Sequence, residues 1–130
     1  MRKKDKEILL RDLSARLSYG VIVEIISYGQ ETLMPWVGKL SCKDLDCFIH
    51  NVAYKSIKPY LRPLSSMTEE ELKTYHSYCE CDDGDFTGKI LYFDTIESFD
   101  YLTSIHIDYR GLIPMGLAIE VTEENNPYKE

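Results

Sequence analysis

The sequence predicts an α+β domain, in which a small antiparallel sheet of about three to five strands packs with about three helices. Two kinds of segment alternate along the 130 residues. In one kind the apolar residues recur at helical spacing, and the other is a short run rich in β-branched residues, typical of a strand. Polar turns separate them, and no repeat, low-complexity tract or linker divides the chain. We therefore expect one domain spanning residues 1–130.

The N-terminal segment predicts a helix. In DKEILLRDLSARLSYG, Leu10, Leu13 and Leu17 recur at helical spacing and form one apolar stripe. Gly20 follows this stripe, and glycine commonly ends helices because it adopts left-handed backbone angles without strain. The helix is therefore expected to end there.

Three strands in series are expected next. The run VIVEIISYG is dense in β-branched residues, and a turn at YGQE leads into TLMPWVGKLSC. Pro35 has no N–H to give to a ladder, so this second strand should be an edge strand or break there. After the polar KDLD, CFIHNVAY (47–54) predicts a third strand that completes an antiparallel meander. The proline-punctuated KPYLRPLSS (58–66) is expected to be a connector.

A second helix is expected in TEEELKTYHSYC. Thr68 and Glu71 have the spacing of a capping box, in which each side chain accepts a hydrogen bond from the other residue's backbone N–H. Three successive glutamates then lie at the positive end of the helix dipole. The residues expected on its core face are Leu72, Tyr75, His76 and Cys79.

The C-terminal part predicts a strand, a helix and a return to the sheet. KILYF reads as the strand, and Asp94 is expected to cap the helix TIESFDYLTSIH. DYRGLIPMG is a short turn or helix, and LAIEV (117–121) is expected to rejoin the sheet. The apolar stripe expected on the helix is Ile96, Phe99, Leu102 and Ile105.

The charge distribution predicts that the protein does not bind nucleic acid, and the lack of a membrane span or signal peptide predicts a cytoplasmic location. The net charge is −7, and residues 65–100 carry ten acidic residues against two basic ones. Such a surface repels phosphate backbones, so it is either a solvated face or a face for a basic partner. No apolar run is long enough to span a membrane, and charged residues interrupt any signal peptide. The four cysteines are expected to be free thiols.

A metal-binding domain built on CECDDGDFTGKILYFD (79–94) is the alternative function. Aligned on a calcium-binding EF-hand loop, the stretch places matching residues at Asp83, Asp85, Thr87, Gly88, Ile90 and Asp94. Leu91 has no side-chain oxygen for position nine, and aspartate is shorter than the usual glutamate at position twelve. The candidate zinc ligands are His76, Cys79, Cys81, Cys42 and Cys47. Their spacings are not those of a zinc knuckle, so we expect an acidic loop without a metal.

The segment SIHIDYRG (104–111) is the densest cluster of polar and aromatic residues. His106 and Asp108 are residue types that serve as a base and its orienting carboxylate, and Arg110 is a residue type that binds an anion. The alternative is structural: Asp108 caps a turn, Arg110 pairs with an acidic neighbour, and Tyr109 packs with its hydroxyl outward. No phosphate-loop, dinucleotide, serine-hydrolase or zinc-protease motif is present, so no cofactor or catalytic residue is expected.

Several phrases of the chain resemble a known group of proteins. They are DLSARLSYGVIV, IKPYLRPLSSMTEEE and TIESFDYLTSIHIDYRGLIPMGLAIE. They are similar to small proteins of unknown function in gut Bacteroides genomes and their phages or mobile elements. The resemblance implies a bacterial or phage protein that works inside the cell, and it assigns no activity, cofactor or catalytic residue.

The leading hypothesis is therefore a non-enzymatic accessory protein that binds another protein. Ten tyrosines support it, because tyrosine covers apolar area with a polar tip, as partner interfaces require. The partner surface is expected around Tyr101, His106, Asp108, Tyr109 and Arg110.

Overall fold

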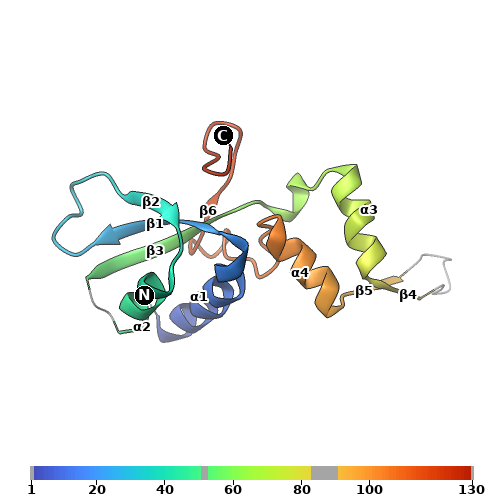
Figure 1. Cartoon of the computed structure of the whole chain (residues 1–130), viewed down its shortest axis with the longest axis horizontal. Helices are drawn as coiled ribbons and strands as arrows, with labels where there is room; N and C mark the ends of the chain where they lie inside the picture. Colours follow the sequence, from blue (N-terminus) through green and yellow to red (C-terminus); the bar gives the residue numbers. More distant parts are fainter. Residues whose placement is uncertain (1, 51–52, 83–90, 130) are drawn as a thin grey trace.

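The computed structural model describes residues 2–50, 53–82 and 91–129 and confirms the α+β class (Figure 1). Its elements are α1 (Lys3–Arg16), the 3₁₀-helix η1 (Leu17–Tyr19), β1 (Ile22–Ser27), β2 (Trp36–Lys39), α2 (Cys42–Ile49), β3 (Tyr54–Leu61), the 3₁₀-helix η2 (Leu64–Ser66), α3 (Glu69–Tyr78), β4 (Glu80–Asp82), β5 (Leu91–Phe93), α4 (Ile96–Ser104) and β6 (Ile119–Glu120). Within these residues no helix has the length and apolarity of a membrane span.

The sheet has the order β2-β1-β3-β6 and carries α1 and α2 on one face (Figure 1). β1 pairs antiparallel with β2 and β3, whereas β6 runs parallel to β3. Alternate residues of a strand point to the same face, so Val23 and Ile25 join Ile57 in the core beneath the helices. The predicted return of residues 117–121 to the sheet is confirmed by β6. The edge position predicted for the strand after Pro35 is confirmed by β2.

The buried face of α1 differs from the predicted apolar stripe. Its buried positions are Leu9, Asp12, Leu13 and Arg16, which follow helical spacing. Leu10 and Leu17, which the stripe included, are only half-buried. A stripe chosen from apolar residues alone misses this face, because Asp12 and Arg16, four positions apart, neutralise each other and are both buried. Gly20 does end this segment, in the left-handed conformation.

The third predicted strand is wrong, because residues 42–49 form α2. Ser41 and Asp44 make a capping box: Ser41 Oγ accepts from the Asp44 N–H, and Asp44 Oδ2 accepts from the Ser41 N–H. β3 instead extends into the first four residues of the predicted connector, 58–61, and pairs on the free edge of β1, so the strands do not form a meander. Pro59 fits in β3 because pairing with β6 begins only at Tyr60, which leaves one side of the strand open at the proline.

Residues 63–82 and 91–104, here called the arm, extend from the sheet through α3, the β4–β5 pair and α4 (Figure 1). The core face predicted for α3 is wrong, since no residue of Glu69–Tyr78 is buried. The helix instead contacts β5 of the β4–β5 pair: the His76 ring stacks on Tyr92 with centroids 3.8 Å apart. The Tyr75 hydroxyl donates to Asp94 Oδ1.

The start of α4 is capped by Thr95 and not, as predicted, by Asp94. Thr95 Oγ1 accepts from the Ser98 N–H, and Ser98 Oγ accepts from the Thr95 N–H. The capping box turns Ser98 inward, so the buried side of α4 runs through Ser98 and Leu102. Ile96, which the predicted stripe placed on that side, is 78% exposed.

The arm is joined to β3 by an ion pair between Arg62 and Glu71. Nη1 and Nη2 of Arg62 donate to the two carboxylate oxygens of Glu71 over 2.8 and 2.6 Å. The same carboxylate accepts from the Thr68 N–H, so the capping box predicted for α3 is present and one side chain both starts the helix and anchors it. The hydrogen bonds from Arg62 are the main cause that lowers the pKa of Glu71 from 4.5 to about 2.

We predict that Glu71→Gln removes this anchor while keeping the helix start, because glutamine also completes a capping box. The substitution should lower the free energy of unfolding by about 1 kcal/mol at pH 7, as expected for a partly exposed pair. The folded-state pKa of Glu71 lies below its ordinary value, so its contribution is present above pH 4.5 and is lost as the pH falls toward 2. Urea unfolding between pH 7 and pH 2 measures the difference.

Glu70→Gln is the matched control, since Glu70 is exposed on the same helical turn. Equal effects of the two substitutions at pH 7 would contradict the anchoring role of Glu71.

Candidate functional site

A fully buried ion pair joins α1 to the segment after α4. Arg16 Nε donates to Asp12 Oδ2 over 2.7 Å, and both side chains have 0% exposure. Arg16 Nη2 donates over 2.7 Å to the carbonyl of Ile107, 91 residues along the chain. Charges are tolerated in an interior when they are paired and hydrogen-bonded, as Arg16 Nε and Nη2 are, although Arg16 Nη1 and Asp12 Oδ1 have no hydrogen-bond partner among the described residues. The pair therefore fixes where the segment that begins at Ile107 lies.

Arg110 and Tyr109 are held by the same pair. Arg110 Nε lies 3.3 Å from Asp12 Oδ1, so one carboxylate faces two guanidinium groups. The guanidinium carbons of Arg16 and Arg110 lie 5.1 and 5.3 Å from the centroid of the Tyr109 ring, within cation–π range. The structural alternative for Arg110 is therefore confirmed: it pairs with an acidic neighbour, although that neighbour is in α1.

The hydroxyl of Tyr109 does not point outward, as the structural alternative expected. It lies 3.1 Å from Thr103 Oγ1. Since the single Thr103 hydroxyl proton is given to the Phe99 carbonyl, Tyr109 is the donor in this contact. The Tyr109 ring also lies 5.3 Å from the Phe99 ring, so both ends of the side chain are fixed against α4.

His106 ends α4 and takes no part in an acid–base pair with Asp108. Its φ of 64° is left-handed, and the His106 N–H donates to Thr103 O while the Ile107 N–H donates to Leu102 O. This is the Schellman arrangement, with His106 at the position that glycine usually occupies. Leu102 and Ile107, both buried, supply the apolar contact that accompanies such an ending.

The His106 ring stacks on Tyr128, with centroids 3.9 Å apart and an interplanar angle of 11°. Burial is the largest cause that lowers the pKa of His106 from 6.5 to about 4, and the charges of Arg16 and Arg62 lower it further. The Tyr128 hydroxyl accepts from the Ile22 N–H and donates to the Tyr60 carbonyl, which fastens the C-terminal segment to β1 and β3. His106 is therefore an uncharged packing residue at neutral pH.

Asp108 caps a turn, as the structural alternative predicted. Its Oδ1 accepts from the Leu112 N–H and its Oδ2 from the Ile113 N–H, both over 2.9 Å. Its own N–H donates to the Arg62 carbonyl. Both carboxylate oxygens thus hold the turn after Gly111, whose φ of 77° requires glycine-like freedom.

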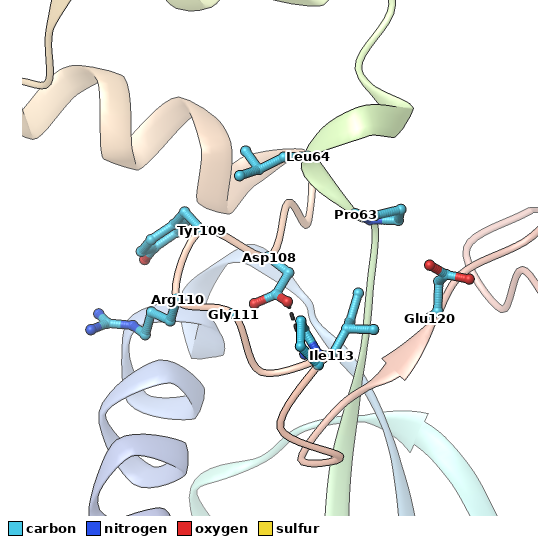
Figure 2. Close-up of a pocket in the computed structure, with 9 residues that line it drawn as sticks. Pro63, Leu64, Asp108, Tyr109, Arg110, Gly111, Ile113 and Glu120 are labelled. Carbon is cyan, nitrogen blue, oxygen red and sulfur yellow. Dashed lines mark hydrogen bonds between the residues drawn. The ribbon is translucent and has the colours of Figure 1, made fainter.

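Tyr109 and Arg110 line two neighbouring pockets, which we call together the Tyr109 groove. The larger pocket, of about 490 Å³, lies between η2, the segment 108–114 and β6 (Figure 2). The other, of about 430 Å³, is bounded by Phe99, Tyr109 and Arg110. The residues of both pockets are Pro63, Leu64, Phe99, Asp108, Tyr109, Arg110, Gly111, Ile113, Pro114 and Glu120.

Tyr101, the remaining predicted partner residue, lies away from the Tyr109 groove. It lines a pocket of about 310 Å³ with residues of η1, α3 and α4. The predicted surface is therefore divided: Tyr109 and Arg110 stay together, Tyr101 belongs to a second pocket, and His106 and Asp108 have structural roles.

The calcium-loop residues 83–90 lie outside the described residues. Within the described part, no three His, Cys, Asp or Glu side chains are grouped to hold a metal ion. Cys42 and Cys47 lie on α2, whereas Cys79 and Cys81 lie at the far end of the arm (Figure 1). All four cysteines are free.

Comparisons with known proteins give no further assignment. A scan against protein-family models matched none of them, and searches of curated proteins and of solved structures gave no match.

We predict that Asp12→Asn destabilises the protein by about 3–5 kcal/mol, because it leaves the buried Arg16 without a counter-charge. Urea unfolding at pH 7 measures the change. Glu7→Gln, on the exposed side of α1, is the control and should change the free energy of unfolding by less than about 0.5 kcal/mol. A stability of Asp12→Asn equal to that of the parent would show that the pair does not anchor α1.

We predict that His106 makes the protein less stable in acid. The folded-state pKa of about 4 is below the ordinary 6.5, so the unfolded chain binds the extra proton and stability falls between pH 6.5 and pH 4. His106→Asn tolerates the left-handed backbone and has no such titration, so its free energy of unfolding should fall less across that window. His50→Asn is the exposed control. Parallel pH curves for His106→Asn and the parent would refute the role of His106.

Proposed function

We propose that this protein is a non-enzymatic accessory protein that binds another protein inside the cell, and that the Tyr109 groove is its contact surface. The observation that carries the proposal is the fixed pair of Tyr109 and Arg110 in a groove lined mainly by apolar residues. The sequence resemblance supports an origin in a Bacteroides genome or one of its phages or mobile elements.

Tyr109 and Arg110 are suited to anchor a partner. Tyrosine and arginine are enriched among the residues that dominate binding energy at interfaces. Here Tyr109 is held by Thr103 and Phe99, and Arg110 by Asp12, so little side-chain freedom remains to be lost on binding.

The chemistry of the groove indicates what the partner presents. Leu64 and Phe99 expose 55% and 40% of their surface beside the two anchors, which suits an apolar side chain. Among the described residues only Asp12 pairs with Arg110, through Nε, so the two Nη groups can donate to a partner. We therefore expect a segment in which an apolar side chain is followed by a carboxylate or exposed carbonyl oxygens.

The engaged carboxylate of Asp108 supports binding over acid–base chemistry, although the buried His106 Nδ1 has no hydrogen-bond partner among the described residues. The carboxylate of Asp108 is used by two backbone N–H groups, and His106 is stacked on Tyr128. A base and its orienting carboxylate need free atoms directed at each other.

We predict that Arg110→Gln abolishes partner retention in affinity capture from the native cell. Asp12 keeps Arg16 as its counter-charge in this variant, so the melting temperature should fall by only a few degrees. Arg11→Gln, which removes the same charge from the exposed side of α1, is the matched control and should retain the partner. Mass spectrometry of the eluates compares the three proteins.

Two results would contradict the proposal. If Arg110→Gln retained the same proteins as the parent, the groove would not be the contact surface. If the parent retained nothing above a tag-only control, protein binding itself would be wrong.

A further inference from the structure

A second pocket lies where the arm meets the end of α1, and we call it the tyrosine pocket. Its volume is about 310 Å³, and its residues are Tyr19, Tyr78, Glu97, Asp100, Tyr101 and Ser104. The four from α4 are spaced i, i+3, i+4 and i+7, so they share one face of that helix. Tyr78 is the last residue of α3, and Tyr19 belongs to η1.

Three aromatic rings line this pocket. The Tyr78 and Tyr101 rings have centroids 5.7 Å apart and are tilted by 37°. Tyr19 and Tyr78 are 37% and 45% exposed, so part of each ring is open to a ligand. The face of an aromatic ring carries partial negative charge and attracts a cation.

Two carboxylates without a counter-charge complete the pocket. Across residues 2–50, 53–82 and 91–129, no basic side chain lies within ion-pair distance of Glu97 or Asp100. The Ser104 hydroxyl is turned away to the Tyr101 carbonyl. Ring faces and unpaired carboxylates favour the same ligand charge, and a neutral apolar group would leave the carboxylates without a partner.

We propose that the tyrosine pocket binds a lysine or arginine side chain from a basic segment of a partner protein. The cation would lie against the tyrosine rings and pair with Glu97 and Asp100. The excess of ten acidic over two basic residues in 65–100 attracts such a segment from a distance. The inference rests on the proposed binding of another protein but not on the Tyr109 groove, with which the pocket shares no residue.

The test is an NMR titration of the full ¹⁵N-labelled chain with single amino-acid analogues. The probes are N-acetyl-lysine methylamide and N-acetyl-arginine methylamide, with the uncharged N-acetyl-norleucine methylamide as their matched control. The cationic probes should give saturable shifts of the Glu97, Asp100 and Tyr101 amides, with a Kd on the order of millimolar. Equal shifts with the norleucine probe, or none with either cation, would overturn the proposal.

Variants separate the pocket from the overall charge. Glu97→Gln with Asp100→Asn should weaken binding of the cationic probes about tenfold. Tyr101→Leu, which keeps the apolar bulk but removes the ring, should weaken it about threefold. Glu123→Gln with Glu124→Gln removes the same charge from an exposed segment outside the pocket and should change Kd less than twofold.

If the Glu123 and Glu124 variant weakened binding as much as the Glu97 and Asp100 variant, net charge alone would explain it and the proposal would fail. Arg110→Gln should leave binding of the cationic probes unchanged, so failure of the Tyr109 groove and failure of the tyrosine pocket are distinguishable.

Discussion

The buried guanidinium of Arg16 is the interaction on which both surfaces of this protein depend. It reaches from the end of α1 to the carbonyl of Ile107, directly after the ending of α4. It thereby sets the position of α4, of the turn capped by Asp108, and of Tyr109 and Arg110 between them. Taking a charge out of water costs several kcal/mol, and the two short hydrogen bonds of Arg16 and the negative charge of Asp12 offset that cost only while all partners are present.

Asp12 has two roles in this arrangement. Its carboxylate neutralises Arg16, and its second oxygen faces Arg110 at the edge of the groove. Because one negative charge faces two positive ones, Arg110 keeps attraction for a further anionic or carbonyl oxygen. A residue in the first helix thus determines the chemistry of a surface formed by residues almost a hundred positions later.

Some local signals in the sequence predict the local structure, and the errors arise both where composition favours the wrong element and where the partners are distant. The sequence predicts the capping box of Thr68 and Glu71 but not the similar capping box of Ser41 and Asp44, because the composition of CFIHNVAY is typical of a strand. β3 was missed because Pro59 argues against a strand unless one side is unpaired. In the site, Tyr109 and Arg110 are neighbours in the sequence, and they line the same groove in the structure. The spacing of Asp12 and Arg16 signals an ion pair, but not its burial or its contact with Ile107.

Different faces of α4 contribute to two different surfaces. Phe99 and Thr103 face Tyr109 and contribute to the groove, whereas Glu97, Asp100 and Tyr101 face the tyrosine pocket. Helical spacing separates these faces, so the first surface can present a cationic anchor while the second presents carboxylates. Arg110 lies in the segment after α4, where Asp12 pairs with it, so the carboxylates on the other face of the helix remain available to cations from outside.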